Sequence, residues 1–390
     1  MNKYDFNKII NRRNTNSVKY DFAKEFNKPE DVMPMWVADM DFEVFDEVRH
    51  ALQEVSQNQI LGYTKAKDDY YEAVQTWFNN NFNYMPKKEW FVKTPGVVVA
   101  MANAIKAFTK EGDSILIQKP VYHPFELTIL KNNRKVIDNT LIYEDNYYCI
   151  DFNDFEEKIK HNNVRLFILC SPHNPIMRVW TKDELYKMGQ ICRKYGVIVF
   201  SDEIHQDIVY NNYKHTIFSN SDESFNDFCV ISTSPAKTFN LAGLQIANNF
   251  IPNQKLRKLF SDELYKSGYH QSGIMGLTAC KKAYECGYTW HKHLIQYLHS
   301  NIQTVQNFLK TKVPQVIMPE PQATYLLWLN FLNLGINHRE LENIILNNAK
   351  VWLHNGITFG KTGAGFMRIN IACPNSVLTT SLENIAKSIN

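Results

Sequence analysis

Short apolar runs alternate with longer helical patterns between residues 91 and 250, and this alternation constrains the fold more than any other feature of the chain. The runs are rich in branched side chains, as expected of strands that are buried on both faces of a parallel sheet. The pattern predicts an α/β fold with a mostly parallel, doubly wound sheet and helices on both of its faces. The clearest predicted strands span residues 114–118, 164–170, 197–200 and 229–231.

One helix of this region has recognisable start and stop signals. Thr181 and Glu184 have the spacing of a capping box, in which each side chain satisfies a free backbone N–H of the first turn. Gly196 follows a basic last turn that contains Arg193 and Lys194. The sequence therefore predicts a helix that begins after Thr181 and ends before Gly196.

The order of elements changes after residue 250. Two helices are predicted over residues 254–266 and 289–309, and the remainder indicates a separate small α+β lobe. The first fifty residues, with Pro29 and Pro34, fit poorly into the sheet pattern. We therefore expect an N-terminal arm with part of the small domain (1–48), a large domain (49–287) and a C-terminal small domain (288–390). Strands of the small lobe are predicted at 324–330 and 366–372, and helices at 338–348 and 377–389.

Composition excludes several classes of protein. The 390 residues are 44% hydrophobic and 21% charged, which is ordinary globular usage, and the net charge of +3 gives no sign of nucleic-acid or membrane binding. Seven scattered cysteines argue against a disulfide framework and for a reducing compartment. With no signal peptide or membrane-spanning run apparent, we expect a cytoplasmic protein whose partner is a small molecule.

Three polar residues follow predicted strands at their carboxyl ends, which is where ligands bind in doubly wound sheets. Asn174 follows the strand that ends at Cys170, Asp202 follows Phe200, and Lys237 follows the strand near Ser232. Each has an ordinary structural explanation alone, as a turn residue, a helix cap and a solvated amine. Together, an amide, a carboxylate and an amine match the phenolic oxygen, ring nitrogen and aldehyde of pyridoxal 5'-phosphate (PLP).

A phosphate-binding site is predicted at the start of the helix that follows Thr94, Pro95 and Gly96. This helix, over residues 97–108, has no charged residue before Lys106, and the free N–H groups of its first turn suit an anion. Ser234 adds a hydroxyl three residues before Lys237.

Several segments resemble the MalY/PatB group of carbon–sulfur β-lyases, which belong to the fold-type I superfamily of PLP enzymes. The resemblance extends in order from about residue 33 to 373. It rests on the segments at residues 35–42 (MWVADMDF), 62–64 (GYT), 94–98 (TPGVV), 120–125 (PVYHPF), 201–205 (SDEIH), 234–244 (SPAKTFNLAGL) and 366–370 (FMRIN).

The resemblance implies a role for each matching residue. Lys237 would form the Schiff base with the cofactor and act as the catalytic base, and Asp202 would pair with the ring nitrogen. Arg368 would bind the substrate carboxylate, with the backbone near Ala38 closing over the substrate. The remaining implied cofactor contacts are Asn174 at the phenolic oxygen, Tyr122 against the ring and near the substrate, His205 beside the phenolic oxygen, Gly96, Val97 and Ser234 at the phosphate, and Tyr63 reaching the phosphate from the other subunit of a homodimer.

The chain departs from the superfamily pattern at two places. Gln245 stands eight residues after Lys237, where many fold-type I enzymes place an arginine on the phosphate. Ile176 and Met177 follow Asn174 and Pro175, where a small glycine is usual. The first departure implies that neutral donors hold the phosphate, and the second implies a reshaped loop.

The resemblance implies cleavage of cystathionine or a cysteine S-conjugate to a thiol, pyruvate and ammonia. Two alternatives stay open: an aminotransferase, which would use the same lysine, aspartate and arginine, and a regulatory protein that retains the PLP site as a scaffold.

Other motifs give weaker indications. Gly356, Gly360 and Lys361 imitate a phosphate-binding loop, but the spacing is one residue short. His291 and His293 lie two residues apart on a predicted helix and therefore make a poor metal pair. We expect no metal site.

Overall fold

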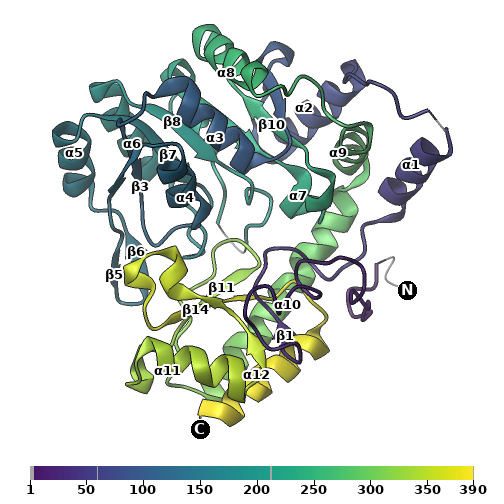
Figure 1. Ribbon diagram of the computed structural model, residues 1–390, viewed down its shortest axis with the longest axis vertical. Helices are drawn as coiled ribbons and strands as arrows, with labels where there is room; N and C mark the ends of the chain where they lie inside the picture. The colour runs from purple at the N-terminus through teal and green to yellow at the C-terminus, as the bar shows by residue number, and fades with distance from the viewer. Residues whose placement is uncertain (1–3, 59, 211–212, 390) are drawn as a thin grey trace.

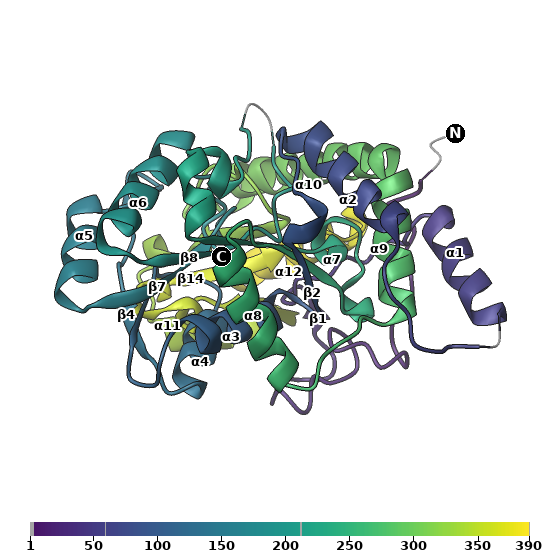
Figure 2. The ribbon, with the colours of Figure 1, turned by 90° about the horizontal axis from the view of Figure 1, so that it is seen from above.

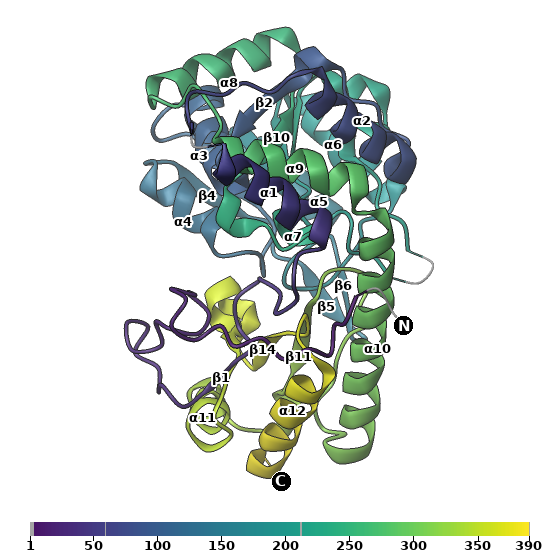
Figure 3. The same cartoon turned by 90° about the vertical axis from the view of Figure 1, so that its right-hand side faces the viewer.

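The computed structural model describes residues 4–58, 60–210 and 213–389, which form two lobes (Figures 1 and 3). The larger lobe, uppermost in Figure 3, contains a seven-stranded sheet, and the smaller lobe contains a three-stranded sheet. Helix α10 (Tyr288–Lys312) runs from the larger lobe along the smaller one. Within the described ranges, no helix is both long enough and apolar enough to cross a lipid bilayer.

The large sheet has the strand order β2-β10-β9-β8-β7-β3-β4. Strand β10 pairs antiparallel with both neighbours, and every other pairing is parallel. The predicted mostly parallel sheet is confirmed, and its four clearest strands correspond to β3, β7, β8 and β9. The strands are β2 (Phe91–Thr94), β3 (Ser114–Ile117), β4 (Lys135–Asp138), β7 (Val164–Cys170), β8 (Ile198–Asp202), β9 (Cys229–Thr233) and β10 (Ala247–Phe250).

Helices cover both faces of this sheet (Figure 2). Side chains alternate between the faces along each strand, so Leu166 and Ile168 of β7 belong to one buried cluster and Phe167 and Leu169 to another. The first cluster includes α3 (Val97–Phe108), α4 (Pro124–Lys131) and α8 (Gln254–Lys266). The second includes α2 (Asp68–Phe82), α5 (Phe152–His161), α6 (Lys182–Tyr195) and α9 (Ile274–Cys286).

The predicted capping box at the start of α6 is present. Thr181 Oγ1 accepts a hydrogen bond from the Glu184 N–H at 3.1 Å, and Glu184 Oε2 accepts one from the Thr181 N–H at 2.8 Å. Gly196 ends the helix with a φ of 67°, a left-handed conformation that costs glycine little. The sequence therefore placed both ends of α6 correctly.

The smaller lobe contains β11 (Leu326–Asn330), β14 (Phe366–Asn370) and β13 (His354–Asn355), which form an antiparallel sheet. Its helices are α11 (His338–Asn343) and α12 (Asn375–Ile389). Two expectations need correction. The helix predicted at 338–348 changes to a π-helix at Ile344–Asn348, and the strand predicted from 324 begins at Leu326 because Thr324 has a φ of 67°. In addition, helix α9 was not predicted.

The N-terminal arm packs on the smaller lobe through residues 35–41, which we call the strap (Figure 3). Immediately before it, β1 (Met33–Pro34) pairs in parallel with β12 (Val351–Trp352). The Asn370 side chain then donates to the carbonyls of Val37 and Asp39, at 2.7 and 2.6 Å. We propose domain boundaries at residues 48/49 and 287/288. The second coincides with the start of α10 at Tyr288, whereas the first falls inside helix α1 (Asp46–Gln57).

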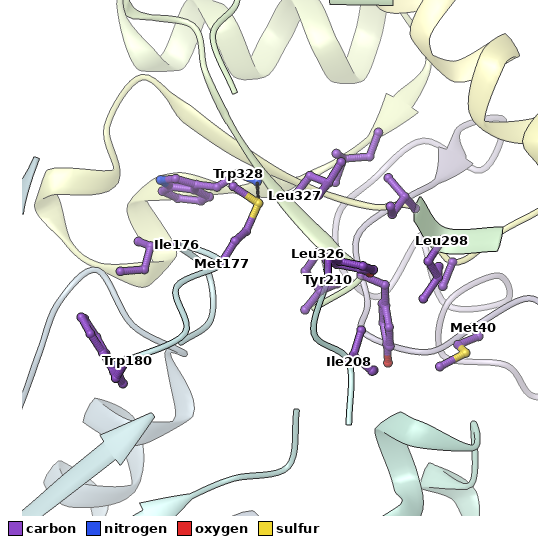
Figure 4. Close-up of a cluster of buried hydrophobic side chains, with 14 of the residues drawn as sticks. Met40, Ile176, Met177, Trp180, Ile208, Tyr210, Leu298, Leu326, Leu327 and Trp328 are labelled. Atoms are coloured by element: carbon purple, nitrogen blue, oxygen red, sulfur yellow. Dashed lines mark hydrogen bonds between the residues drawn. The ribbon is translucent and has the colours of Figure 1, made fainter. Parts of the chain in front are cut away.

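The two lobes share one hydrophobic core (Figure 4). Met177, in the loop after β7, lies beside Trp328 of β11, whose backbone N–H donates to the methionine sulfur at 3.3 Å. Tyr210 of the larger lobe packs near Leu326 of the smaller one. Because this core is continuous, groups from both lobes are held in fixed positions relative to one another.

Candidate functional site

One cavity of about 200 Å³ brings together the three strand-end residues that the sequence singled out, Asn174, Asp202 and Lys237. It lies at the carboxyl ends of β7, β8 and β9. Further predicted site residues line the same cavity: Ala38, Gly96, Val97, Tyr122, His205 and Ser234.

Lys237 belongs to the short helix α7 (Pro235–Thr238), which begins directly after β9. Ser234 caps this helix by accepting a hydrogen bond from the Ala236 N–H at 3.1 Å. The Lys237 amine donates to the carbonyl oxygen of Ala38 in the strap, at 2.7 Å. Desolvation in the cavity lowers the pKa of Lys237 to about 8, and Arg368 acts in the same direction against Asp39 and Asp202. Near physiological pH the neutral fraction of this amine is therefore larger than that of an ordinary lysine.

Asp202 ends strand β8 with 5% of its surface exposed. Its Oδ1 accepts one hydrogen bond, from the Ile204 N–H at 3.2 Å. Burial raises the pKa of Asp202 to about 7, although this hydrogen bond and the charge of Lys237 oppose the shift. A buried carboxylate with so little compensation is a strong acceptor for a cationic N–H group of a ligand.

Arg368 lies on β14 and is 1% exposed. Its Nη1 donates to Asn174 Oδ1 at 2.8 Å, and its Nη2 donates to the Trp36 carbonyl at 2.9 Å and to His354 Nδ1 at 3.0 Å. Burial lowers the pKa of Arg368 to about 10. Among the described residues no carboxylate pairs with this guanidinium, and its Nε has no hydrogen-bond partner. Such a site suits the carboxylate of a ligand.

The other end of the cavity has the properties of a phosphate site. Gly96 precedes α3, and no side chain caps the first turn of that helix. A Cβ atom added at Gly96 would meet nothing within 4 Å, so the space beside the turn is open. Gln245, the residue that replaces an arginine, lines the same cavity. Backbone N–H groups and neutral side chains are thus the available donors for a phosphate.

The structure adds detail to the remaining predicted residues. The Ser234 hydroxyl donates to the Ile246 carbonyl at 2.6 Å, so it would turn away from that carbonyl to donate to a phosphate. His205 has an unpartnered Nδ1, and burial lowers the pKa of this ring to about 3, which keeps it neutral. Tyr122 lines the cavity, and its N–H donates to the Asn174 carbonyl at 3.1 Å. Tyr63 lies outside the cavity with 98% of its surface exposed.

Sequence reasoning missed three groups of this site. His354 orients Arg368 by accepting its hydrogen bond. The segment just after His354, which imitates a phosphate-binding loop in sequence, forms two short 3-10 helices, Gly356–Phe359 and Lys361–Gly363. Tyr325 donates to the Ala38 carbonyl at 3.1 Å. The negative charge of Asp39 raises the pKa of Lys237. A polar aromatic residue inside the strand predicted at 324–330 was the only available signal for Tyr325.

The donor set fits PLP: an amine for its aldehyde, a buried carboxylate for its ring nitrogen, an amide for its phenolic oxygen and an uncapped helix start for its phosphate. Asn174 gives only its carbonyl end to Arg368, so its NH₂ end is available to donate. No cluster of His, Cys, Asp or Glu suited to a metal ion occurs in the described part of the chain. Fold and site together define the class of fold-type I, PLP-dependent enzymes.

Comparisons with known proteins agree with this class. Residues 30–385 match the family described as aminotransferase class I and II. The chain is 39% identical to cystathionine beta-lyase PatB of Bacillus subtilis, covering 99% of this chain and 100% of that protein, and 30% identical to protein MalY of Escherichia coli, covering 99% of each. The structure of cystalysin from Treponema denticola, which contains PLP, superposes with a TM-score of 0.95 at 35% identity, covering 99% of this chain and 98% of that one. The chain belongs to the MalY/PatB group of the aminotransferase class I and II family.

Proposed function

We propose that this protein is a PLP-dependent carbon–sulfur β-lyase that cleaves cystathionine or a related cysteine thioether. The observation that carries the proposal is the cavity lined by Lys237 and Asp202, with Arg368 bonded to the lining residue Asn174. An amine of lowered pKa, a buried carboxylate and a guanidinium without a carboxylate partner are the groups that α,β-elimination from an amino acid requires. The similarity to a cystathionine beta-lyase at 39% identity supports the choice of substrate class.

PLP, when bound, supplies an aldehyde that captures the substrate amine and a ring that withdraws electrons from Cα. Arg368 binds the substrate carboxylate and thereby orients Cα toward the lysine. Asp202 holds a proton on the ring nitrogen, and Asn174 donates to the phenolic oxygen. Lys237, as the free amine, removes the proton from Cα.

The overall reaction balances with one water molecule. The Cα–H and Cβ–S bonds of the thioether break, and sulfur leaves with a proton as the free thiol. The remaining three-carbon enamine takes up water and yields pyruvate and ammonia. No external oxidant, reductant or keto acid is consumed.

The test is to incubate the holoenzyme with cystathionine or S-methylcysteine without any keto-acid acceptor. Thiol and pyruvate should appear together in a 1:1 ratio, and Lys237→Ala should abolish both the yellow colour and turnover. Arg165→Lys, at an exposed position of β7, serves as a control that keeps activity. Product formation only after a keto acid is added would instead establish an aminotransferase and refute the lyase.

We further propose a homodimer in which Tyr63 contacts the cofactor phosphate held by the partner subunit. Tyr63 projects from the chain next to Ile60 and Leu61, which are 81% and 62% exposed. Apolar side chains so exposed are expected to be covered by another surface. In the same site, Gly96, Val97 and Ser234 would bind the phosphate from within the subunit.

We propose a cytoplasmic location on the basis of the cysteines. All seven are free thiols, as expected in a reducing compartment. Five of them are buried: Cys170, Cys192, Cys229, Cys280 and Cys373.

A further inference from the structure

Two hydrogen bonds converge on the carbonyl oxygen of Ala38. The Lys237 amine donates to it at 2.7 Å, and the Tyr325 hydroxyl donates to it at 3.1 Å. We propose that Tyr325 is a positioning residue, whose hydroxyl fixes the Ala38 carbonyl so that it holds the free amine of Lys237 with the nitrogen lone pair available. The proposal deepens the function proposed above by assigning control of its base to a residue outside the cavity lining.

The strap presents the Ala38 carbonyl to the lysine because its neighbours are held from the other side. The Asn370 side chain donates hydrogen bonds to the carbonyls of Val37 and Asp39. The carbonyl between them points toward Lys237 and Tyr325, which both donate to it. Tyr325 is fully buried immediately before β11. Its ring also contacts His205 edge-on, with centroids 6.2 Å apart.

The chemistry of a carbonyl oxygen explains what the second donor does. Such an oxygen has two lone pairs, and Tyr325 occupies one of them. The other accepts a single N–H from Lys237, which leaves the lone pair of the neutral amine free to take a proton. Two donors on one acceptor also compete, so the hydroxyl weakens the attraction of this carbonyl for the ammonium form.

Three charged groups also act on the Lys237 amine: Asp39 of the strap, Arg368 of β14 and Asp202 of β8. The Tyr325 hydroxyl stays protonated, because burial and the charge of Asp39 raise its pKa far above the ordinary value. Removing this hydroxyl should therefore raise the pKa of Lys237 without changing any formal charge.

The chain offers a matched control for the variant Tyr325→Phe. Tyr210 is also buried in the core, and its hydroxyl likewise donates to a backbone carbonyl, that of Thr324, at 2.8 Å. The hydroxyl of this tyrosine, visible in Figure 4, bonds to Thr324 and not to the Ala38 carbonyl of the strap. Tyr210→Phe thus removes the same kind of hydrogen bond in the same part of the core.

The first experiment measures the rate at which 2,4-dinitrofluorobenzene arylates Lys237 in the cofactor-free full-length protein as a function of pH, with residue 237 quantified by peptide mass spectrometry. We expect Tyr325→Phe to raise the midpoint of this profile by about 0.5 to 1 pH unit. Tyr210→Phe should leave it unchanged. Neither substrate nor turnover is involved, so this result is independent of whether the protein is a lyase.

The second experiment uses the holoenzyme and a cysteine thioether with deuterium at Cα. In Tyr325→Phe, kcat at pH 7 should fall about 3- to 10-fold and recover near pH 9, and the deuterium isotope effect should increase because proton removal becomes slower. Equal midpoints in all three proteins, or the same shift in both variants, would overturn the proposal. It is also overturned if Tyr325→Phe fails to fold while Tyr210→Phe folds, because the hydroxyl would then serve the fold.

Discussion

At the scale of single residues, the burial of Asp202 leads to a prediction about how the stability of the fold depends on pH. Its pKa is about 7 in the folded, cofactor-free protein, against about 3.9 for an unfolded chain. Between these values the folded state holds a proton that the unfolded state has lost, so stability falls as pH rises from about 4 to about 7. Asp202→Asn should remove this fall in stability with rising pH. At pH 8 the cofactor-free variant should unfold with a free energy about 2 to 4 kcal/mol higher than the parent, and at pH 4 the two should agree.

Urea denaturation at both pH values measures this difference. Asp183→Asn, at an exposed position of α6, should change stability by less than about 0.5 kcal/mol at either pH. Equal stability of the parent protein and Asp202→Asn at pH 8 would show that the buried carboxylate is compensated by another group. The same variant should lose activity, since an amide cannot hold a proton on the cofactor ring.

At the scale of elements, the junction between β9 and α7 carries the lysine, and Ser234 joins both parts of it. Its hydroxyl caps α7 and also reaches the Ile246 carbonyl. Ser234→Ala should weaken cofactor binding about 10-fold, because the cap contributes about 1 kcal/mol and the expected phosphate contact is lost as well. Fluorescence titration of the cofactor-free protein with PLP measures this affinity.

Thr181→Ala is the matched control for this prediction. It also removes a helix N-cap, that of α6, but Thr181 does not line the cavity. It should lower the melting temperature by a few degrees and leave the affinity for PLP unchanged. An unchanged affinity in Ser234→Ala would mean that the backbone N–H groups of α3 hold the phosphate without this hydroxyl.

The sequence predicted the elements whose signal is local. Strand β7 is an unbroken apolar run because both of its faces are buried, and the ends of α6 are specified by Thr181, Glu184 and Gly196. The change from α11 to a π-helix left no comparable signal. The contact of Tyr325 with Ala38 joins residues 287 positions apart, so only the folded chain reveals it.

At the scale of the whole molecule, the proposed dimer predicts complementation between two inactive variants. Tyr63→Ala and Lys237→Ala should each be inactive or nearly so alone. In a mixed dimer, one site combines an intact Lys237 with an intact Tyr63 from the partner subunit. Mixing the two proteins after unfolding and refolding should therefore restore about one quarter of the parent activity, given random pairing with one working site in half of the dimers.

Activity assays and sedimentation of the refolded mixture test this prediction. A mixture of Tyr63→Ala with Tyr63→Ala,Lys237→Ala should stay inactive and serves as the control. Absence of recovery in a mixture that sediments as a dimer would show that Tyr63 acts within its own subunit or has no role at the phosphate.

The attachment of the strap to the smaller lobe has a consequence for how the protein matures on the ribosome. Met33 and Pro34 can pair only after Val351 and Trp352 have been synthesised. The carbonyls of Val37 and Asp39 can accept their hydrogen bonds only after Asn370 has been synthesised. The lysine and the large sheet emerge more than a hundred residues earlier. A nascent chain can thus build the sheet while its amine still lacks the carbonyl that holds it, and chemical competence arrives only once residues 351–370 have been translated.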